Sequence, residues 1–244
     1  MFRTSFSQLA KKLVVLFALF FILKPVQAQE ISLLVEPLPA YRDSISDLLL
    51  KYSFPIKQGQ KPHDLYIGLS WESSLLLTRD GKILPFVGRF NVVSSLVEMK
   101  VNAQVFAFDI NRIKAVYIGG RLFVPVEGLL IKGQEKNSFV EILTTGTVNL
   151  LCYYDLNSSI ENSSDVLTSS ITGKTSYRLN PIYYSKNADG DIQKLAIANQ
   201  KQLDQFFQEF SPQISDYIKT NKLKRKKERD LIILFKYYNE LLDQ

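Results

Sequence analysis

Between residues 66 and 197 the chain alternates short apolar runs with dipeptides that favour tight turns. Asp80-Gly81, Gly119-Gly120 and Asp189-Gly190 each separate two runs rich in Val, Ile, Phe and Tyr. Asp-Gly and Gly-Gly tolerate the left-handed backbone of a two-residue hairpin turn, and β-branched and aromatic side chains favour strands. Hairpins at this spacing predict an antiparallel β meander, arranged as a small barrel or as a sandwich.

After about Asn199 the apolar period changes from two residues to that of a helix. Ser211-Pro212 is predicted to start one helix, with Ser at the N-cap and Pro in the first turn, where its missing N–H is not needed. The last helix has a continuous apolar stripe, formed by Leu231, Leu234, Phe235, Tyr238, Leu241 and Leu242. The predicted fold class is therefore α+β, an antiparallel β meander with a docked C-terminal helical unit at 199–244.

Residues 156–176 interrupt the β pattern, because Ser, Asn and Thr dominate there and little can be buried. We predict a mobile loop or an insertion for this Ser/Asn-rich segment. The mainly antiparallel β domain then spans 29–198 and contains the loop.

Residues 1–28 have the three parts of a cleavable signal peptide. Arg3, Lys11 and Lys12 precede the apolar stretch Leu13–Leu23, and Val26-Gln27-Ala28 supplies small residues before the cleavage point. A membrane-spanning helix needs roughly 20 apolar residues, so this stretch is too short to remain as an anchor. We expect an exported protein that is periplasmic, outer-membrane associated or secreted, with no transmembrane segment in the mature chain.

Charge and cysteine usage restrict the partners. The formal net charge is +6, but the four basic residues of segment 1–28 and the run 219–229 account for the excess, so general nucleic-acid affinity is not expected. Cys152 is the single cysteine, so no intramolecular disulfide can form. Because Cys152 lies within a strand-like apolar run, we interpret it as a buried side chain.

Several positions together resemble a known family. Phe206-Phe207, Asp230-Leu231 and Leu234–Asn239 match its C-terminal part, and Gly88–Asn91 with Phe139–Leu143 match its β part. The chain is similar, over about residues 74–244, to a group of uncharacterised exported Bacteroidota proteins, in which a β region precedes a helical tail with a Tyr-Tyr-Asn-like motif. The resemblance implies export and a non-enzymatic default, and it brings no catalytic residues. The chain departs from the family pattern at Lys224, where a Ser that caps the last helix is expected.

Motifs for nucleophilic or metal chemistry are weak. His63 is the single histidine and precedes Gly68-Leu69-Ser70-Trp71-Glu72, which lacks the second Gly of a nucleophile elbow. One His and one Cys cannot complete a common zinc set, and Asn187, Asp189 and Asp191 lack the spacing of a calcium loop. We therefore expect no cofactor, no metal and no enzymatic activity.

Two hypotheses with a defined chemistry remain beside an interaction or scaffolding role with an unknown envelope protein. A glycan-acting hydrolase would use a carboxylate pair such as Glu98 with Glu141, both predicted on strands. An anionic surface ligand would bind the basic run 222–229. Its candidate anion-binding residues are Lys222, Lys224, Arg225, Lys226, Lys227 and Arg229.

Overall fold

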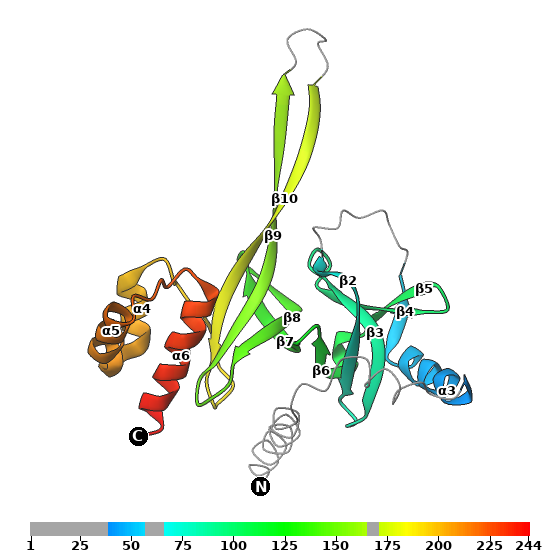
Figure 1. Cartoon of the computed structure of the whole chain (residues 1–244), viewed down its shortest axis with the longest axis horizontal. Coiled ribbons are helices and arrows are strands. Elements are labelled where there is room, and N and C mark those ends of the chain that lie inside the picture. The colour runs from blue at the N-terminus through cyan, green and yellow to red at the C-terminus, as the bar shows by residue number, and fades with distance from the viewer. Residues whose placement is uncertain (1–38, 57–65, 165–170) are drawn as a thin grey trace, which may run out of the picture. The chain divides into compact units, whose positions relative to one another are not determined.

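A computed structural model describes residues 39–56, 66–164 and 171–244, and the chain divides into two units at residues 1–44 and 45–244. The predicted signal peptide at 1–28 and His63 lie outside the described residues. Helix α3 (Pro39–Leu50) crosses the boundary between the units. All other described elements belong to the second unit, which carries both the sheet and the C-terminal helices (Figure 1).

The second unit contains one open antiparallel sheet, in the order β1-β5-β4-β3-β2-β6-β7-β8-β9-β10-β11. Its strands are β1 (Ser53–Pro55), β2 (Tyr66–Thr78), β3 (Ile83–Asn91), β4 (Leu96–Val101), β5 (Gln104–Phe108), β6 (Ile113–Ile118), β7 (Arg121–Ile131), β8 (Gln134–Thr144), β9 (Asn149–Ser164), β10 (Ile171–Lys186) and β11 (Ile192–Lys194). With the helices that follow, this sheet confirms the predicted α+β class. The strands form a single continuous ladder, where we expected a barrel or a sandwich.

The predicted hairpins are confirmed, but only Gly119-Gly120 forms a two-residue turn, because four residues separate β2 from β3 and five separate β10 from β11. Asp80-Gly81 joins β2 to β3, Gly119-Gly120 joins β6 to β7, and Asp189-Gly190 joins β10 to β11, with positive φ at each of these glycines. A further turn, which the dipeptide rule did not find, is Asn102-Ala103 between β4 and β5. Its two central residues have φ of 48° and 66°, the backbone of a type I′ turn.

The sheet bends strongly around an aromatic core. The ring of Phe90 on β3 stacks on Phe123 of β7, with ring centroids 4.7 Å apart. Strands β2 and β6 separate β3 from β7 in the ladder, so a flat sheet would place these rings roughly 14 Å apart. A register shift in β2 between Ile67 and Glu72 breaks the regular pairing with β3, and such bulges bend a strand.

The prediction of a loop at 156–176 was wrong. Strands β9 and β10 pair continuously from Asn149↔Lys186 to Ser164↔Ile171, so most of the Ser/Asn-rich segment is a β ribbon. Figure 1 shows the two strands running on together beyond the ends of β7 and β8. The error has a physical cause: backbone hydrogen bonds hold this ribbon, and they leave no apolar period in the sequence.

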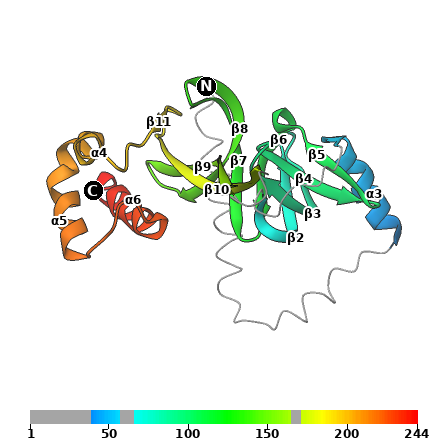
Figure 2. The same ribbon diagram turned by 90° about the horizontal axis from the view of Figure 1, so that it is seen from above.

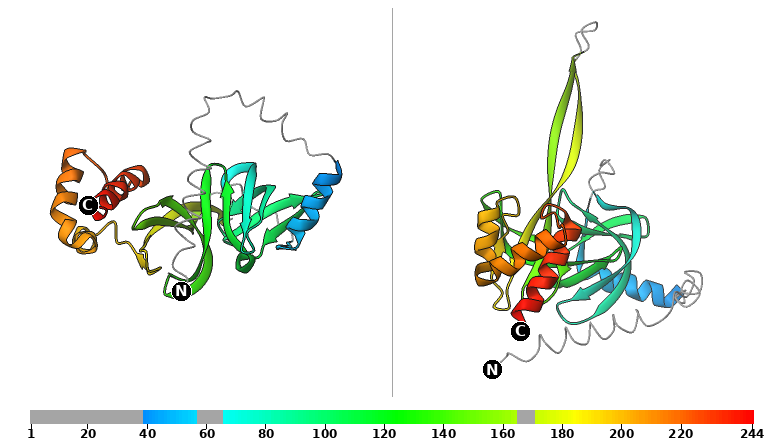
Figure 3. Two further views of the ribbon diagram at one scale, coloured as in Figure 1. Left: turned by 90° about the horizontal axis from the view of Figure 1, so that it is seen from below. Right: turned by 60° about the vertical axis from the view of Figure 1, so that its left-hand side comes forward.

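The C-terminal unit consists of α4 (Gln200–Phe207), a short 3-10 helix (Gln208–Phe210), α5 (Ser211–Thr220) and α6 (Glu228–Leu242), which form a group in Figures 2 and 3. Phe210 occupies the N-cap of α5, so our placement of Ser211 there was wrong by one residue, although Pro212 lies in the first turn as expected. None of the helices in the described part of the chain is long and apolar enough to cross a membrane.

Helix α6 packs against β8 and β9 through its apolar stripe. Leu231, Leu234 and Phe235 are almost fully buried. Tyr238 lies within an aromatic cluster, where its ring centroid is 4.9 Å from that of Phe207 and 6.0 Å from that of Phe210. These contacts confirm that the helical unit docks on the β region.

Candidate functional site

A buried polar cluster lies where α6 meets the sheet. Arg121 of β7 binds both oxygens of Glu141 on β8, with Nε–Oε1 and Nη2–Oε2 distances of 2.9 and 2.6 Å. The Tyr154 hydroxyl on β9 donates to the same carboxylate at 2.6 Å and lies 3.5 Å from an oxygen of Glu228. Glu228 belongs to the first turn of α6. The cluster therefore connects three strands to the start of the last helix.

Every charged group of this cluster has a partner of complementary chemistry. Glu141 is 6% exposed, and a bidentate arginine together with a tyrosine hydroxyl offsets the loss of its hydration. Burial, followed by the neighbouring Cys152 and Glu141, raises the pKa of Tyr154 far above its usual value. A phenol held in its neutral form donates a hydrogen bond, so this geometry fits a structural role.

Glu98 occupies a second and separate ion pair. Arg89 donates to it at 2.9 Å and Asn91 at 2.7 Å, while the guanidinium of Arg89 lies 3.8 Å from the ring centroid of Tyr66. The structure thus gives Glu98 and Glu141 an arginine each, from different hairpins. The oxygens that a general acid or base would use are bound by these partners.

The basic run lies in the connection between α5 and α6. Lys222, Lys224, Lys226, Lys227 and Arg229 are exposed, whereas Arg225 is half-buried and donates to Gln200 at 2.6 Å. No ion pair between described residues involves any of the six.

Lys227 is the N-cap of α6 and makes no side-chain cap. Asp230, in the first turn of the helix, accepts the backbone N–H of Lys224 at 2.8 Å and so holds the preceding chain against α6. Glu228 and Asp230 in the first turn also offset the unfavourable meeting of lysines with the positive end of the helix.

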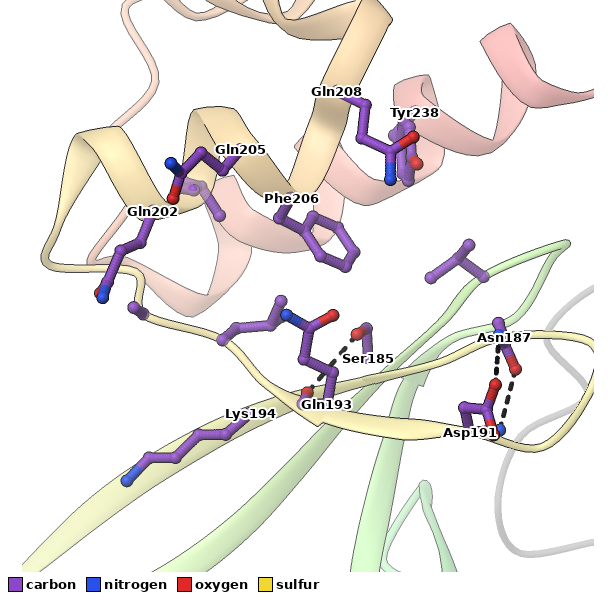
Figure 4. Close-up of a pocket in the computed structure, with 14 residues that line it drawn as sticks. Ser185, Asn187, Asp191, Gln193, Lys194, Gln202, Gln205, Phe206, Gln208 and Tyr238 are labelled. Carbon is purple, nitrogen blue, oxygen red and sulfur yellow. Dashed lines mark hydrogen bonds between the residues drawn. The ribbon is translucent and has the colours of Figure 1, made fainter.

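A groove of about 610 Å³ lies between the β10–β11 hairpin and α4 (Figure 4). From the hairpin, Ser185, Asn187, Asp191, Gln193 and Lys194 line it, and from the helical unit Gln202, Gln205, Phe206, Gln208 and Tyr238 do so. The backbone N–H of Asp191 donates to Asn187 Oδ1 at 2.8 Å, and the Asn187 amide donates to Asp191 Oδ2 at 3.2 Å. This pair therefore closes the turn between β10 and β11.

Sequence reasoning missed this groove. Its signal was an unusual density of glutamine, with five in residues 193–208, on either side of the change from strand to helix. Side chains from a hairpin and a helix converge there because β11 leads directly into α4.

Cys152 is fully buried on β9, which confirms its interpretation as a core side chain. Burial raises the pKa of its thiol well above the ordinary range, so the reactive thiolate is disfavoured. A group of three or more His, Cys, Asp or Glu side chains suited to a metal ion does not occur among the described residues.

We expect the protein to lose stability at alkaline pH because of the buried tyrosine Tyr184. Burial, together with Tyr153 and Asp155, raises the pKa of Tyr184 from 10.0 to about 12, and its hydroxyl donates to the Leu130 carbonyl at 2.9 Å. The neutral form is favoured by folding, so its contribution is complete below pH 10 and is lost as the pH rises from 10 to 12. Urea denaturation across this window should show a falling free energy of unfolding. In Tyr184→Phe the free energy of unfolding should fall less steeply with pH. An equally steep fall in the variant would contradict the assignment of this effect to Tyr184.

Comparisons of this chain with protein-family models, with curated protein sequences and with solved structures gave no match.

Proposed function

We propose that the protein is an exported envelope protein without enzymatic activity, which acts in interaction or scaffolding. The observation that carries this proposal is the ribbon of β9 and β10. In the described ladder, β8 pairs with β9 at Leu150, Leu151 and Cys152, and β11 pairs with β10 at residues 184–186. Beyond these residues, β9 and β10 pair with each other and with no other strand of the described ladder.

Such a ribbon offers two strand edges whose outward N–H and C=O groups are not used by the described ladder. An exposed edge accepts an added strand from another chain, with the main-chain hydrogen bonds supplying affinity. A two-stranded ribbon is marginally stable in water, so a partner strand would stabilise it. Its Ser- and Asn-rich sequence suits a surface that is exposed to water before it binds.

Shortening the ribbon tests the proposal. Register pairs Ser158 with Tyr177, so replacing residues 159–176 by Asn-Gly closes the hairpin at a matched pair with a favourable turn. The intact protein should capture a defined envelope protein from its own envelope fraction, and the shortened variant should lose it. Gln134→Ala, at the exposed start of β8, is the control and should retain capture. Equal capture by the intact and shortened proteins would contradict a role for the ribbon.

Export is a separate part of the proposal. Amino-terminal sequencing of the protein isolated from its own cells should give Gln29 as the first residue. If the first residue is Met1, the proposed export is contradicted. Membership of the exported Bacteroidota group stays a prediction from the residues that resemble it.

A second candidate function is binding of an anionic surface ligand at residues 222–229. It is favoured by the five exposed cations, because none of them is paired in the described ion pairs. Retention on heparin should weaken steeply with salt, since added ions screen the attraction between the exposed cations and the polyanion. Lys224→Gln with Lys226→Gln should shorten retention, whereas Lys114→Gln with Lys136→Gln, also exposed, should not. Retention that does not depend on salt would count against this site.

A further inference from the structure

We propose that the groove between the β10–β11 hairpin and α4 binds an uncharged saccharide. The inference goes beyond an interaction role of the ribbon, because the groove lies at the opposite, paired end of β10 and uses other residues. Its volume of about 610 Å³ falls within the range of small-ligand sites, roughly 300–1,000 Å³.

Amide side chains supply the polar recognition. Gln193, Gln202, Gln205 and Gln208 are exposed at the groove, and none of their side-chain amides takes part in the hydrogen bonds found among the described residues. Figure 4 shows Gln202 and Gln205 on α4 and Gln193 on the hairpin among the side chains that line the groove. An amide offers two N–H donors and a carbonyl acceptor, and a hydroxyl group both donates and accepts. A ligand with many hydroxyl groups therefore matches this lining without needing a charge.

An aromatic ring supplies the apolar part. Figure 4 shows the ring of Phe206 pointing from α4 into the space above β11. Phe207, Phe235 and Tyr238 hold the ring in place, with centroid distances of 5.2, 5.8 and 5.8 Å. The half-buried side chain leaves apolar surface at the groove, on which the C–H face of a sugar ring can pack.

The charges of the lining favour a neutral ligand. Lys194 and Asp191 carry opposite charges, and the Asp191 carboxylate already accepts from Asn187. The groove offers a phosphate or an acidic saccharide one cation, Lys194, whereas the basic run 222–229 offers several. An anionic ligand therefore fits the basic run better than the groove. An extended peptide would use the edge of β11, but that strand has three residues and provides a short ladder.

Titration with four neutral oligosaccharides tests the proposal, namely cellohexaose, maltohexaose, mannohexaose and N-acetylchitohexaose. At least one should bind the purified protein, as measured by calorimetry and by saturation-transfer NMR. The affinity should be insensitive to salt and to Lys224→Gln with Lys226→Gln. If none of the four binds at millimolar concentration, or if binding follows salt and those lysines, the proposal is overturned.

Variants place the ligand in the groove. Gln202→Ala and Gln205→Ala should each weaken binding about fivefold, since each removes a hydrogen bond to the ligand. Gln213→Ala removes an exposed glutamine from α5 that does not line the groove, and it should leave Kd unchanged. Phe206→Leu should weaken binding about five- to tenfold while keeping an apolar side chain. An equal effect of the Gln202 and Gln213 variants would place the saccharide elsewhere and overturn the proposal.

Discussion

Replacing Arg121 with methionine is expected to lower the free energy of unfolding by roughly 3 kcal/mol. The variant leaves Glu141 buried without the bidentate partner that binds both of its oxygens. Removing one member of a buried ion pair is costly because the remaining charge loses its hydration without a replacement. We place the effect at the lower end of the range because the Arg121 side chain is 32% exposed. Urea denaturation of both proteins at neutral pH measures the difference.

Two further variants make the interpretation specific. Arg79→Met removes an arginine of the same type from the exposed pair with Glu127, where the side chains are 50% and 68% exposed, and should cost less than about 1 kcal/mol. Glu141→Gln on the Arg121→Met background removes the unpaired charge while keeping an acceptor for Tyr154, and should restore roughly half of the loss. If Arg121→Met costs no more than Arg79→Met, the cluster does not hold α6 to the sheet.

Replacing Asn239 with alanine is expected to lower the free energy of unfolding by roughly 3 kcal/mol as well. Its side chain accepts from the Val148 N–H at 2.8 Å and donates to the carbonyls of Val148 and Phe235 at 2.9 and 3.0 Å. Asn239 is 6% exposed, so alanine leaves the backbone polar groups of Val148 inside the protein without this partner. Hydrogen exchange should increase in α6 more than in β2 and β3, because α6 loses its attachment to the sheet.

Asn221→Ala is the matched control for Asn239→Ala, since that exposed amide makes one hydrogen bond, to the Tyr217 carbonyl at 3.0 Å.

Gly146→Ala should disturb the contact between Asn239 and Val148 from the Gly146 side, because an added Cβ would lie 2.4 Å from Cγ of Asn239. Gly146→Ala should be destabilising in the native protein and much milder on the Asn239→Ala background, where the clash is gone. Additive effects would show that the two residues do not share one contact.

The residues that carried the family resemblance have structural roles in this chain. Tyr237 stacks on Tyr217 with ring centroids 3.9 Å apart, Tyr238 lies in the aromatic cluster, and Asn239 holds Val148. In the β half, Gly88 leaves no room for a Cβ beside Phe86, and Arg89 pairs with Glu98. Tyr237 and Tyr238 therefore join α6 to the other helices of the tail, and Asn239 joins it to the residue before β9.

Local signals predicted the hairpins and the helical tail well. Gly81 and Gly190 adopt the positive φ that their turns require, and the stripe from Leu231 to Leu242 sets the buried face of α6 through its period. These properties act within a few residues, so they can be read along the chain. The ribbon of β9 and β10 escaped prediction because main-chain pairing forms it and leaves no apolar period in the sequence.

Length, turn chemistry and apolar period were enough to establish an α+β chain whose helices follow its strands. The partners of Glu98 and Glu141, the groove beside Phe206 and the bend that stacks Phe90 on Phe123 arose from folding. Each joins residues from separate elements, and which side chains meet depends on sheet order, register and curvature. A carboxylate on a strand has the same sequence pattern whether it contacts an arginine, a substrate or water. Its chemistry depends on its neighbours in space, which the pattern does not give.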